Sequence, residues 1–323
     1  MFTAAKPASS RILVVRLGAM GDIIHTLPAA ASLKHSYSGS RLTWMVEAKW
    51  APLLEDNPFI DRVVLLRRDT PAGLLESWRG LRAERYDFAV DFQGLIKSAV
   101  AASAARPDRI FGFHHTQVRE RAAALFYSNK TLSRAAHVVE KNLDLAAAAG
   151  AANLLRTFPL PAGRPEGDLP AGDFVLASPL AGWRAKQWPM EHYQALAALL
   201  GRELGVRLVL DGPPGSGLEH CSGLPGLIHA TRRAAAVVGI DSGPLHLAAA
   251  LGKPGVAIYG PTDPARNGPC GDSLRVLRSP AAVTTYKRGA AIDASMRRIS
   301  PEQVFEALRS MLGERRRPAG CLV

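Results

Sequence analysis

Residues 11–28, RILVVRLGAMGDIIHTLP, contain the pattern that decides the fold. The apolar run 11–16 predicts a buried strand, and the glycines that follow at 18 and 21 predict a tight turn. Asp22 then begins a segment with helical spacing, so we expect a helix over 22–34. A buried strand, a glycine turn and a helix are typical of the βα units that build a parallel sheet.

The same order of elements continues along the chain. We expect strands at 11–16, 42–46, 63–66, 88–92, about 110, 174–177, 207–210, 236–240, 256–259 and 274–277. We expect helices at 22–34, 71–84, 95–105, 118–127, 136–149, 191–204, 244–251 and 301–312; in 71–84, Leu74, Leu75, Trp78 and Leu81 lie on one face. This alternation predicts an α/β protein with two doubly wound, Rossmann-like domains and a cleft at the carboxyl ends of their strands.

A run of prolines and glycines separates the two halves of this pattern. Residues 158–173 contain four prolines and three glycines and predict a linker. We therefore expect one Rossmann-like domain over 1–157, a second over 174–300, and a C-terminal helix with a basic tail over 301–323.

Composition narrows the class of protein. The 323 residues include 40 Lys+Arg and 28 Asp+Glu, a formal net charge of +12, which favours an anionic partner or serves solubility alone. No motif of alternating basic and aromatic residues supports a nucleic-acid binder. The three cysteines form no CxxC pair, so neither a disulfide framework nor a zinc site is expected. No apolar run approaches the roughly 18 residues that span a bilayer, and MFTAAKPASS lacks the core of a signal peptide, so we expect a cytoplasmic protein.

Four stretches place polar residues after predicted strands. Asp22 is either a helix cap or a general base aimed into the cleft. His246 follows the Asp-Ser-Gly turn of 241–243, whose backbone N–H groups suit phosphate. Lys186 lies in a loop where it could neutralise a leaving phosphate, although a surface lysine is the plainer interpretation. In the stretch 91–98, Gln93 and Lys97 could line an acceptor site, and the pattern alone leaves this open.

Five ordered motifs carry a family resemblance. MGDIIHTLPA (20–29), DFQGLIKSA (91–99), KQWP (186–189), DSGPLHLAAALGKP (241–254) and YGPTDP (259–264) resemble those of the ADP-heptose:lipopolysaccharide heptosyltransferases, glycosyltransferase family 9, in the heptosyltransferase I branch. The resemblance runs from about 11 to 312. It implies a GT-B fold and metal-independent, inverting transfer of heptose from ADP-heptose to the Kdo residue of Kdo–lipid A. It also implies work on the inner face of the inner membrane, with no further cofactor and no nucleic-acid partner.

The resemblance also assigns residues to roles. Asp22 matches the general base, and Lys186 matches the lysine that contacts the donor phosphates. The donor-binding residues that it implies are Asp241, Ser242, Gly243, His246, Thr262 and Asp263. The acceptor-binding residues that it suggests are Gly21, His25, Gln93, Lys97, Arg119 and His137, with Arg67, Arg68 and Arg121 as further cations for an anionic acceptor.

Two departures from the family pattern lead to an alternative. First, the stretch Pro179–Gly182 has no hydroxyl side chain just before the Lys186 loop. Second, the segment 212–239 is short, so no helix is expected before the strand at 236, and Glu219 is the only acidic residue near enough to bind a ribose. The alternative is a non-catalytic protein that binds a nucleotide sugar or an anionic glycan.

Overall fold

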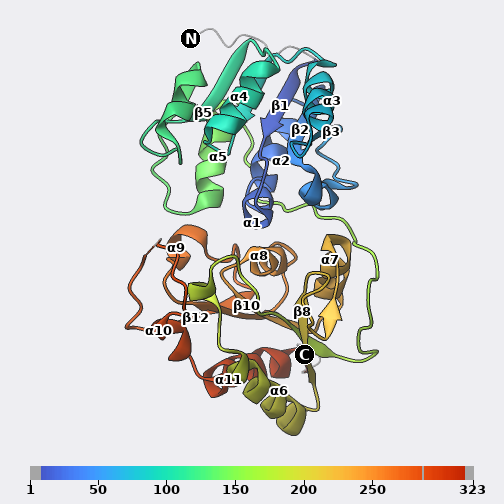
Figure 1. Ribbon diagram of the computed structural model, residues 1–323, viewed down its shortest axis with the longest axis vertical. Coiled ribbons are helices and arrows are strands. Elements are labelled where there is room, and N and C mark those ends of the chain that lie inside the picture. Colours follow the sequence, from blue (N-terminus) through green and yellow to red (C-terminus); the bar gives the residue numbers. More distant parts are fainter. Residues whose placement is uncertain (1–8, 286, 317–323) are drawn as a thin grey trace, which may run out of the picture. The chain divides into compact units, whose positions relative to one another are not determined.

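The computed structural model describes residues 9–285 and 287–316, and the chain divides into two compact units, 1–161 and 162–323 (Figure 1). The division lies inside the segment predicted as a linker. Each unit has its own six-stranded parallel sheet, which confirms the predicted α/β class. None of the helices in the described part of the chain is both long and apolar enough to cross a membrane.

The first unit is a doubly wound sheet with strand order β3-β2-β1-β4-β5-β6. Its strands are β1 (Arg11–Val15), β2 (Arg41–Glu47), β3 (Arg62–Leu66), β4 (Phe88–Asp91), β5 (Arg109–Phe113) and β6 (Asn129–Thr131). Its α-helices are α1 (Met20–Ile24), α2 (Leu27–Ser36), α3 (Pro71–Arg82), α4 (Ile96–Ala104) and α5 (Val138–Ala148), with the 3₁₀ helices η1 (Ala48–Leu54) and η2 (Arg121–Phe126). β1 pairs with β2 on one side and with β4 on the other, so the order of the strands reverses beside β1.

Two predicted helices of this unit were wrong in detail. The helix expected over 22–34 is interrupted after Ile24, because Pro28 in the first turn of α2 has no N–H to donate to a preceding carbonyl. Thr26 spans the break by donating from its hydroxyl to the carbonyl of Asp22 at 2.8 Å. The helix expected over 118–127 is the shorter η2, and the short strand β6 follows it.

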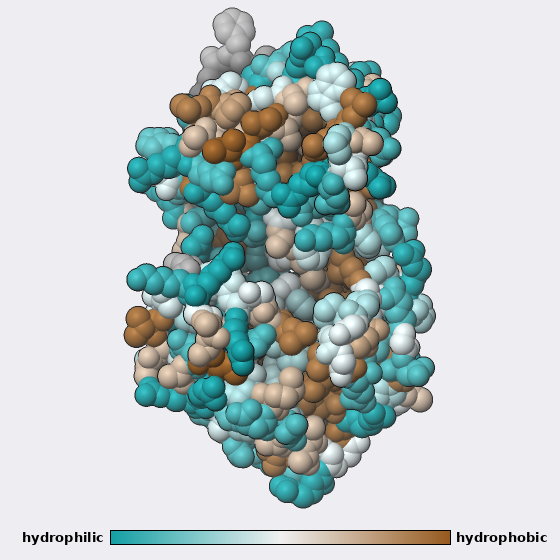
Figure 2. Space-filling view, viewed as in Figure 1, coloured by the Kyte–Doolittle hydropathy of each residue, from teal (hydrophilic) through white to brown (hydrophobic). Residues whose placement is uncertain are grey.

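Alternate side chains of β1 point to opposite faces of the sheet in the core of the first unit. Leu13 and Val15 are fully buried on the face that α4 covers and belong to a cluster with Leu81 of α3. Most of the predicted apolar face of α3 nevertheless remains outside this core, because Leu74, Leu75 and Trp78 are each between 43% and 49% exposed. Hydrophobic side chains therefore remain visible on the surface of this unit (Figure 2).

The second unit repeats the arrangement, with strand order β12-β11-β10-β7-β8-β9. Its strands are β7 (Phe174–Ser178), β8 (Arg207–Gly212), β9 (His220–Cys221), β10 (Ala236–Ile240), β11 (Gly255–Tyr259) and β12 (Leu274–Arg278). Its helices are α6 (Met190–Leu204), α7 (Leu224–Arg233), α8 (Gly243–Ala250), α9 (Pro264–Asn267), α10 (Ala294–Arg297) and α11 (Pro301–Arg316), with the 3₁₀ turn η3 (Arg184–Lys186).

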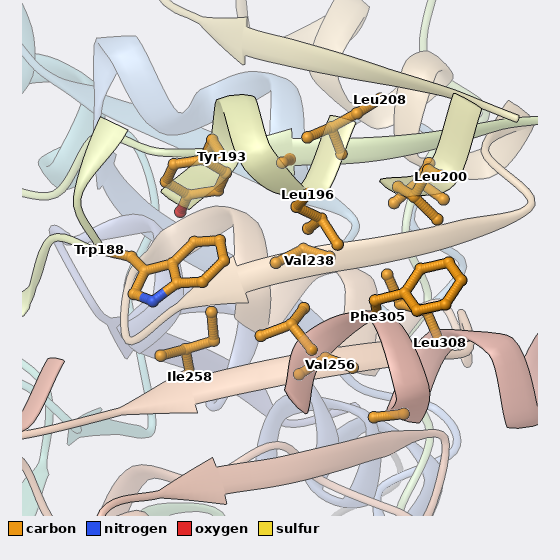
Figure 3. Packing of buried hydrophobic residues seen from close by; sticks show 14 of the residues in the cluster. Trp188, Tyr193, Leu196, Leu200, Leu208, Val238, Val256, Ile258, Phe305 and Leu308 are labelled. Carbon is orange, nitrogen blue, oxygen red and sulfur yellow. The ribbon is translucent and has the colours of Figure 1, made fainter. Parts of the chain in front are cut away.

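Helices cover both faces of this second sheet (Figure 1). On one face, Tyr193, Leu196 and Leu200 of α6 and Phe305 and Leu308 of α11 pack on β10 and β11 (Figure 3). On the other face lie α7 and α8. The two layers of helix leave the carboxyl ends of β7, β10 and β11 as the edge where polar loops emerge.

Candidate active site

The first candidate region lies where β1 and β4 end side by side. Asp22 lies in the short helix α1 that follows β1, and Gln93 lies in the loop that follows β4; both were singled out in the sequence. Gln93 joins the loops directly, because its side-chain oxygen accepts from the backbone N–H of Leu17 at 3.0 Å and of Gly18 at 3.3 Å. The predicted acceptor residue Gln93 therefore holds the glycine turn that precedes α1.

Asp22 lies between two arginines. Its Oδ1 is 2.8 Å from Nη2 of Arg16, and its Oδ2 is 3.2 Å from Nη2 of Arg119. Burial alone would raise the pKa of this carboxyl, but the charges of Arg16 and Arg119 outweigh burial and hold the pKa below its usual value. Asp22 is therefore an ionised acceptor, fixed in orientation by both of its oxygens.

Sequence reasoning missed Arg16 as a functional residue. It was treated as the end of the apolar strand, yet its guanidinium is only 6% exposed and also donates to the carbonyl of Phe92 after β4. The sequence did contain a signal for this role, because an arginine between an apolar strand and a glycine turn is expected to be buried and then needs a counterion nearby. Arg119, predicted to bind the acceptor, instead contacts the candidate base while its side chain stays 59% exposed.

A buried carboxylate supports the second loop. Asp91 is fully buried, accepts from the hydroxyls of Tyr127 at 2.7 Å and Ser98 at 2.8 Å, and accepts from the N–H of Gln93 at 2.8 Å. Burial raises the pKa of Asp91 despite these donors. Asp91 therefore holds the loop from inside the sheet, while Leu95 occupies the cap position of α4.

The structure separates the other predicted acceptor residues into two groups. Gly21 and His25 lie beside Asp22 on or next to α1, and the ring of His137 is 6.0 Å from that of His25. His137 also caps α5, because its Nδ1 accepts from the N–H of Val139 at 3.3 Å. Lys97 instead contacts Glu47 at 3.2 Å. The three further cations have contacts or positions of their own. Arg68 pairs with Glu47 at 3.1 Å, Arg67 lies 3.9 Å from Glu76, and Arg121 is exposed at the start of η2.

The second candidate region lies at the ends of β7, β10 and β11. Nζ of Lys186 is 2.6 Å from Oδ2 of Asp241, and Nε2 of His246 is 3.5 Å from its Oδ1. The Asp241 side chain is only 4% exposed. Burial opposes its ionisation, but the hydrogen bond from His246 and the charge of Lys186 depress the pKa of Asp241 well below its usual value. The structure thus brings three of the predicted donor-site residues together.

Two hydroxyls in this region have no hydrogen-bond partner among the described residues. They are Oγ of Ser242 and Oγ1 of Thr262, both buried at the atom. Ser242 lies at the cap of α8 and its side chain makes no cap bond, while Gly243 begins the helix. Because buried polar atoms normally find a partner, these two hydroxyls are candidates for contact with a ligand.

Asp263 was predicted to bind the donor but has a structural role, whereas Trp183 was not predicted and lies beside Lys186. Asp263 caps α9 through its Oδ1, which accepts from the N–H of Ala265 at 2.9 Å, so this carboxylate already has a structural task. Trp183 was not predicted as a site residue. Its ring centroid lies 4.5 Å from Nζ of Lys186 and 5.5 Å from the guanidinium carbon of Arg288, so a cation–π contact restrains Lys186.

The expectation of no helix within 212–239 was wrong. The structure contains β9 and the complete helix α7 there, with Leu227, Ile228 and Thr231 facing inward. The helix begins with Pro225 in its first turn, a position that proline favours, and this was the signal in the sequence that could have found it. Glu219, suggested for a ribose, pairs with Arg207 at the surface. Within residues 9–285 and 287–316, no group of three or more His, Cys, Asp or Glu side chains is placed to hold a metal ion.

Comparison with known proteins relates these two regions to one family. The family described as glycosyltransferase family 9 (heptosyltransferase) matches residues 74–291. The lipopolysaccharide heptosyltransferase 1 of Escherichia coli K12 is 30% identical over 309 residues, which cover 84% of this chain and 94% of the relative. The Pseudomonas aeruginosa protein of the same name is 30% identical over 297 residues, which cover 81% of this chain and 82% of the relative.

A solved structure agrees with the sequence comparison. The Escherichia coli heptosyltransferase WaaC with ADP-2-deoxy-2-fluoro heptose has 25% sequence identity to the chain and a TM-score of 0.73. The match covers 93% of this chain and 99% of that one. The predicted GT-B architecture, with two parallel-sheet α/β domains, is therefore confirmed.

Proposed function

Because the chain belongs to glycosyltransferase family 9, we propose that it transfers heptose from ADP-heptose to the Kdo residue of Kdo–lipid A in lipopolysaccharide inner-core synthesis. The observation that carries this proposal is the match over 93% of the chain to a heptosyltransferase solved with an ADP-heptose analogue. The heptosyltransferase 1 relatives favour Kdo–lipid A as the acceptor.

Asp22 acts as the general base. A hydroxyl of the Kdo residue attacks the anomeric carbon of heptose from the side opposite the diphosphate, and its proton passes to Asp22. The bond from the anomeric carbon to the β-phosphate oxygen breaks, ADP leaves with the bonding electrons, and the configuration inverts. The ion pairs at 2.8 Å and 3.2 Å keep the carboxylate ionised and aimed.

The second unit binds the donor and stabilises the leaving group. Negative charge grows on the diphosphate as the glycosidic bond breaks. Lys186, held against Asp241 at 2.6 Å, and the N-terminus of α8 provide positive charge and N–H donors for it. The unpartnered hydroxyls of Ser242 and Thr262 add donors at the same place. ADP is a good leaving group and needs no protonation, so we propose that no divalent metal is required.

One of the two departures behind the non-catalytic alternative was the short segment 212–239. Because that segment contains the helix α7, this departure no longer supports the alternative, and the missing hydroxyl in 179–182 remains its only support. We propose that the chain works in the cytoplasm, on the inner face of the inner membrane, where its lipid acceptor is found.

The test is release of ADP from ADP-heptose, measured with and without Kdo–lipid A. We expect release that depends on the acceptor. Binding of ADP-heptose by the folded protein without any release on addition of acceptor would support the non-catalytic alternative and contradict the transferase.

A further inference from the structure

A large apolar surface on the first unit is not used by either candidate region. Leu74, Leu75 and Trp78 of α3 are 49%, 43% and 47% exposed, and Ile96 and Val100 of α4 are 43% and 47% exposed. Single exposed apolar residues are ordinary, but five large ones on two adjacent helices form a contiguous patch of the kind that marks an interaction surface. In Figure 2, brown side chains gather where Figure 1 places α3 and α4.

The patch surrounds a groove between the two helices. The groove has a volume of about 630 Å³, and its apolar lining includes Leu66, Leu74, Trp78, Leu95, Ile96 and Val100. Its charged lining consists of Arg68, Lys97 and Glu120. The Glu120 carboxylate is already used, because it accepts from the N–H of Ile96 at 2.6 Å. The lining of the groove is therefore mainly apolar, with the two cations Arg68 and Lys97 among its charged residues.

The sequence of α3 explains why its large side chains face outward. The positions that face the sheet are small or polar: Gly73 and Ser77 are buried, and the Ser77 hydroxyl donates to the carbonyl of Leu65 at 2.9 Å. A Cβ at Gly73 would lie 2.9 Å from Cβ of Arg67, so the helix sits close to the end of β3. Only Leu81 turns a large apolar side chain into the core. Leu74, Leu75 and Trp78 therefore leave nearly half of their surface outside the core of this unit.

Basic residues outnumber acidic ones around the patch. The segment 67–82 carries four arginines and two acidic residues: Arg67, Arg68, Arg79 and Arg82 against Asp69 and Glu76. Outside this segment, Lys97 adds one positive charge and Glu47 and Glu120 add two negative charges, so five basic residues face four acidic ones; Glu47 contacts both Arg68 and Lys97. The guanidinium carbon of Arg82 lies 5.0 Å from the centroid of the Trp78 ring. An amphipathic tryptophan beside an arginine is typical of the boundary between lipid headgroups and acyl chains.

We propose that the α3–α4 patch (Leu74, Leu75, Trp78, Ile96 and Val100) docks the protein on an anionic phospholipid leaflet. The apolar side chains enter the boundary below the headgroups, and the arginines of 67–82 contact the lipid phosphates. Charge complementarity favours this occupant over a second copy of the chain, which carries the same basic surface. The proposal goes beyond the transferase activity and does not depend on it, since docking needs neither donor nor acceptor.

Docking is tested by sedimentation with vesicles in the absence of both substrates. Vesicles of phosphatidylcholine alone are compared with an equimolar mixture of phosphatidylcholine and phosphatidylglycerol, at low and high salt. We expect binding to the anionic vesicles only, weakened by salt. The double variant Leu74→Glu/Trp78→Glu should lower the vesicle affinity by about tenfold or more, because it places two charges in the apolar contact.

Matched variants separate docking from general damage. Trp78→Phe keeps an aromatic side chain and should still bind the vesicles. Val283→Glu alters an apolar residue of the second unit that is more exposed, at 78%, and should bind like the unchanged protein. The double variant should also keep its rate on a water-soluble acceptor without acyl chains, which shows that it is folded.

Three results would overturn the proposal. They are failure of the unchanged protein to bind anionic vesicles, equal binding by the double variant, and a dimer of the unchanged protein that the double variant converts to monomer in analytical ultracentrifugation. The last result would assign the patch to a second copy. A failure of docking with full turnover on the soluble acceptor would leave the proposed function standing, so the two can fail separately.

Discussion

Substitution of Asp22 by asparagine is the sharpest test of the catalytic proposal. The change keeps the shape of the side chain and removes the charge that accepts the proton. A positioned base typically contributes ~10²–10⁴-fold to the rate. That factor corresponds to about 3–5 kcal/mol in the activation free energy. We therefore expect ADP release to fall by that factor while ADP binding, which uses residues of the second unit, stays unchanged.

The same substitution has a cost in stability that can be worked from the structure. Arg16 is 6% exposed and loses its counterion at 2.8 Å. Removing one partner of a buried ion pair costs ~3–5 kcal/mol, and the amide oxygen of asparagine can still accept one hydrogen bond from Arg16. The free energy of unfolding should therefore fall by about 3 kcal/mol, at the lower end of that range. Urea unfolding of the variant measures it.

A second variant separates the two effects. In Arg16→Met/Asp22→Asn the uncompensated cation is gone, so much of the lost stability should return while the rate stays low. The reasoning is refuted if folded Asp22→Asn keeps its rate within about tenfold of the unchanged protein, since a base contributes more than that. Arg16→Met alone should move the acidic limb of the pH–rate profile upward, because the pKa of Asp22 loses the positive charge that lowers it.

Three further changes test the donor region. Lys186→Met should weaken ADP binding by about tenfold to a hundredfold, measured by calorimetry, because it removes a charge-assisted contact; unchanged affinity would exclude Lys186 from the diphosphate. Ser242→Ala and Thr262→Val should each weaken ADP binding severalfold and leave the melting temperature unchanged, since neither hydroxyl has a partner within the described residues. A fall in melting temperature would show that these hydroxyls serve the fold. Because the folded pKa values of Asp22 and Asp241 are depressed, the stability that these two carboxylates contribute should be complete above the unfolded carboxyl pKa of about 4 and be lost as pH drops below it. Unfolding curves of the unchanged protein and of Asp22→Asn at several pH values isolate the part due to Asp22, and the same loss with acid in both would contradict it. Chelation of divalent metals should leave the rate unchanged, and a loss restored by Mg²⁺ would contradict a metal-independent step.

Local sequence was sufficient for ten strands and for most helices, but it missed the short edge strands β6 and β9. Runs such as 236–240 are apolar without interruption, as expected of strands buried on both faces. The larger errors among the helices fell in two segments. No helix was expected within 212–239, which contains α7, and an α-helix was expected over 118–127, where the chain makes the shorter η2.

The chemistry of the site was predictable only in part. The pattern placed Asp22 and Lys186 after strands, since loops at strand ends are a local feature. The pattern could not predict contacts between residues far apart in the sequence. Arg119 contacts Asp22 from 97 positions away, and Lys186 contacts Asp241 from 55 positions away. Such pairings depend on which strands become neighbours, and strand order is not written in any one segment.

Both sheets use the same connection of strands, because β7-β8-β9-β10-β11-β12 and β1-β2-β3-β4-β5-β6 occupy equivalent places. The functional side chains of both halves stand in the segments that follow the strands, on short helices, turns and loops, outside the ladders of backbone hydrogen bonds. The two halves therefore share one order of strands and differ in the segments that connect them. A chimera that takes 179–188 and 241–246 from another family member should keep its strand order and change only the contacts with the donor diphosphate.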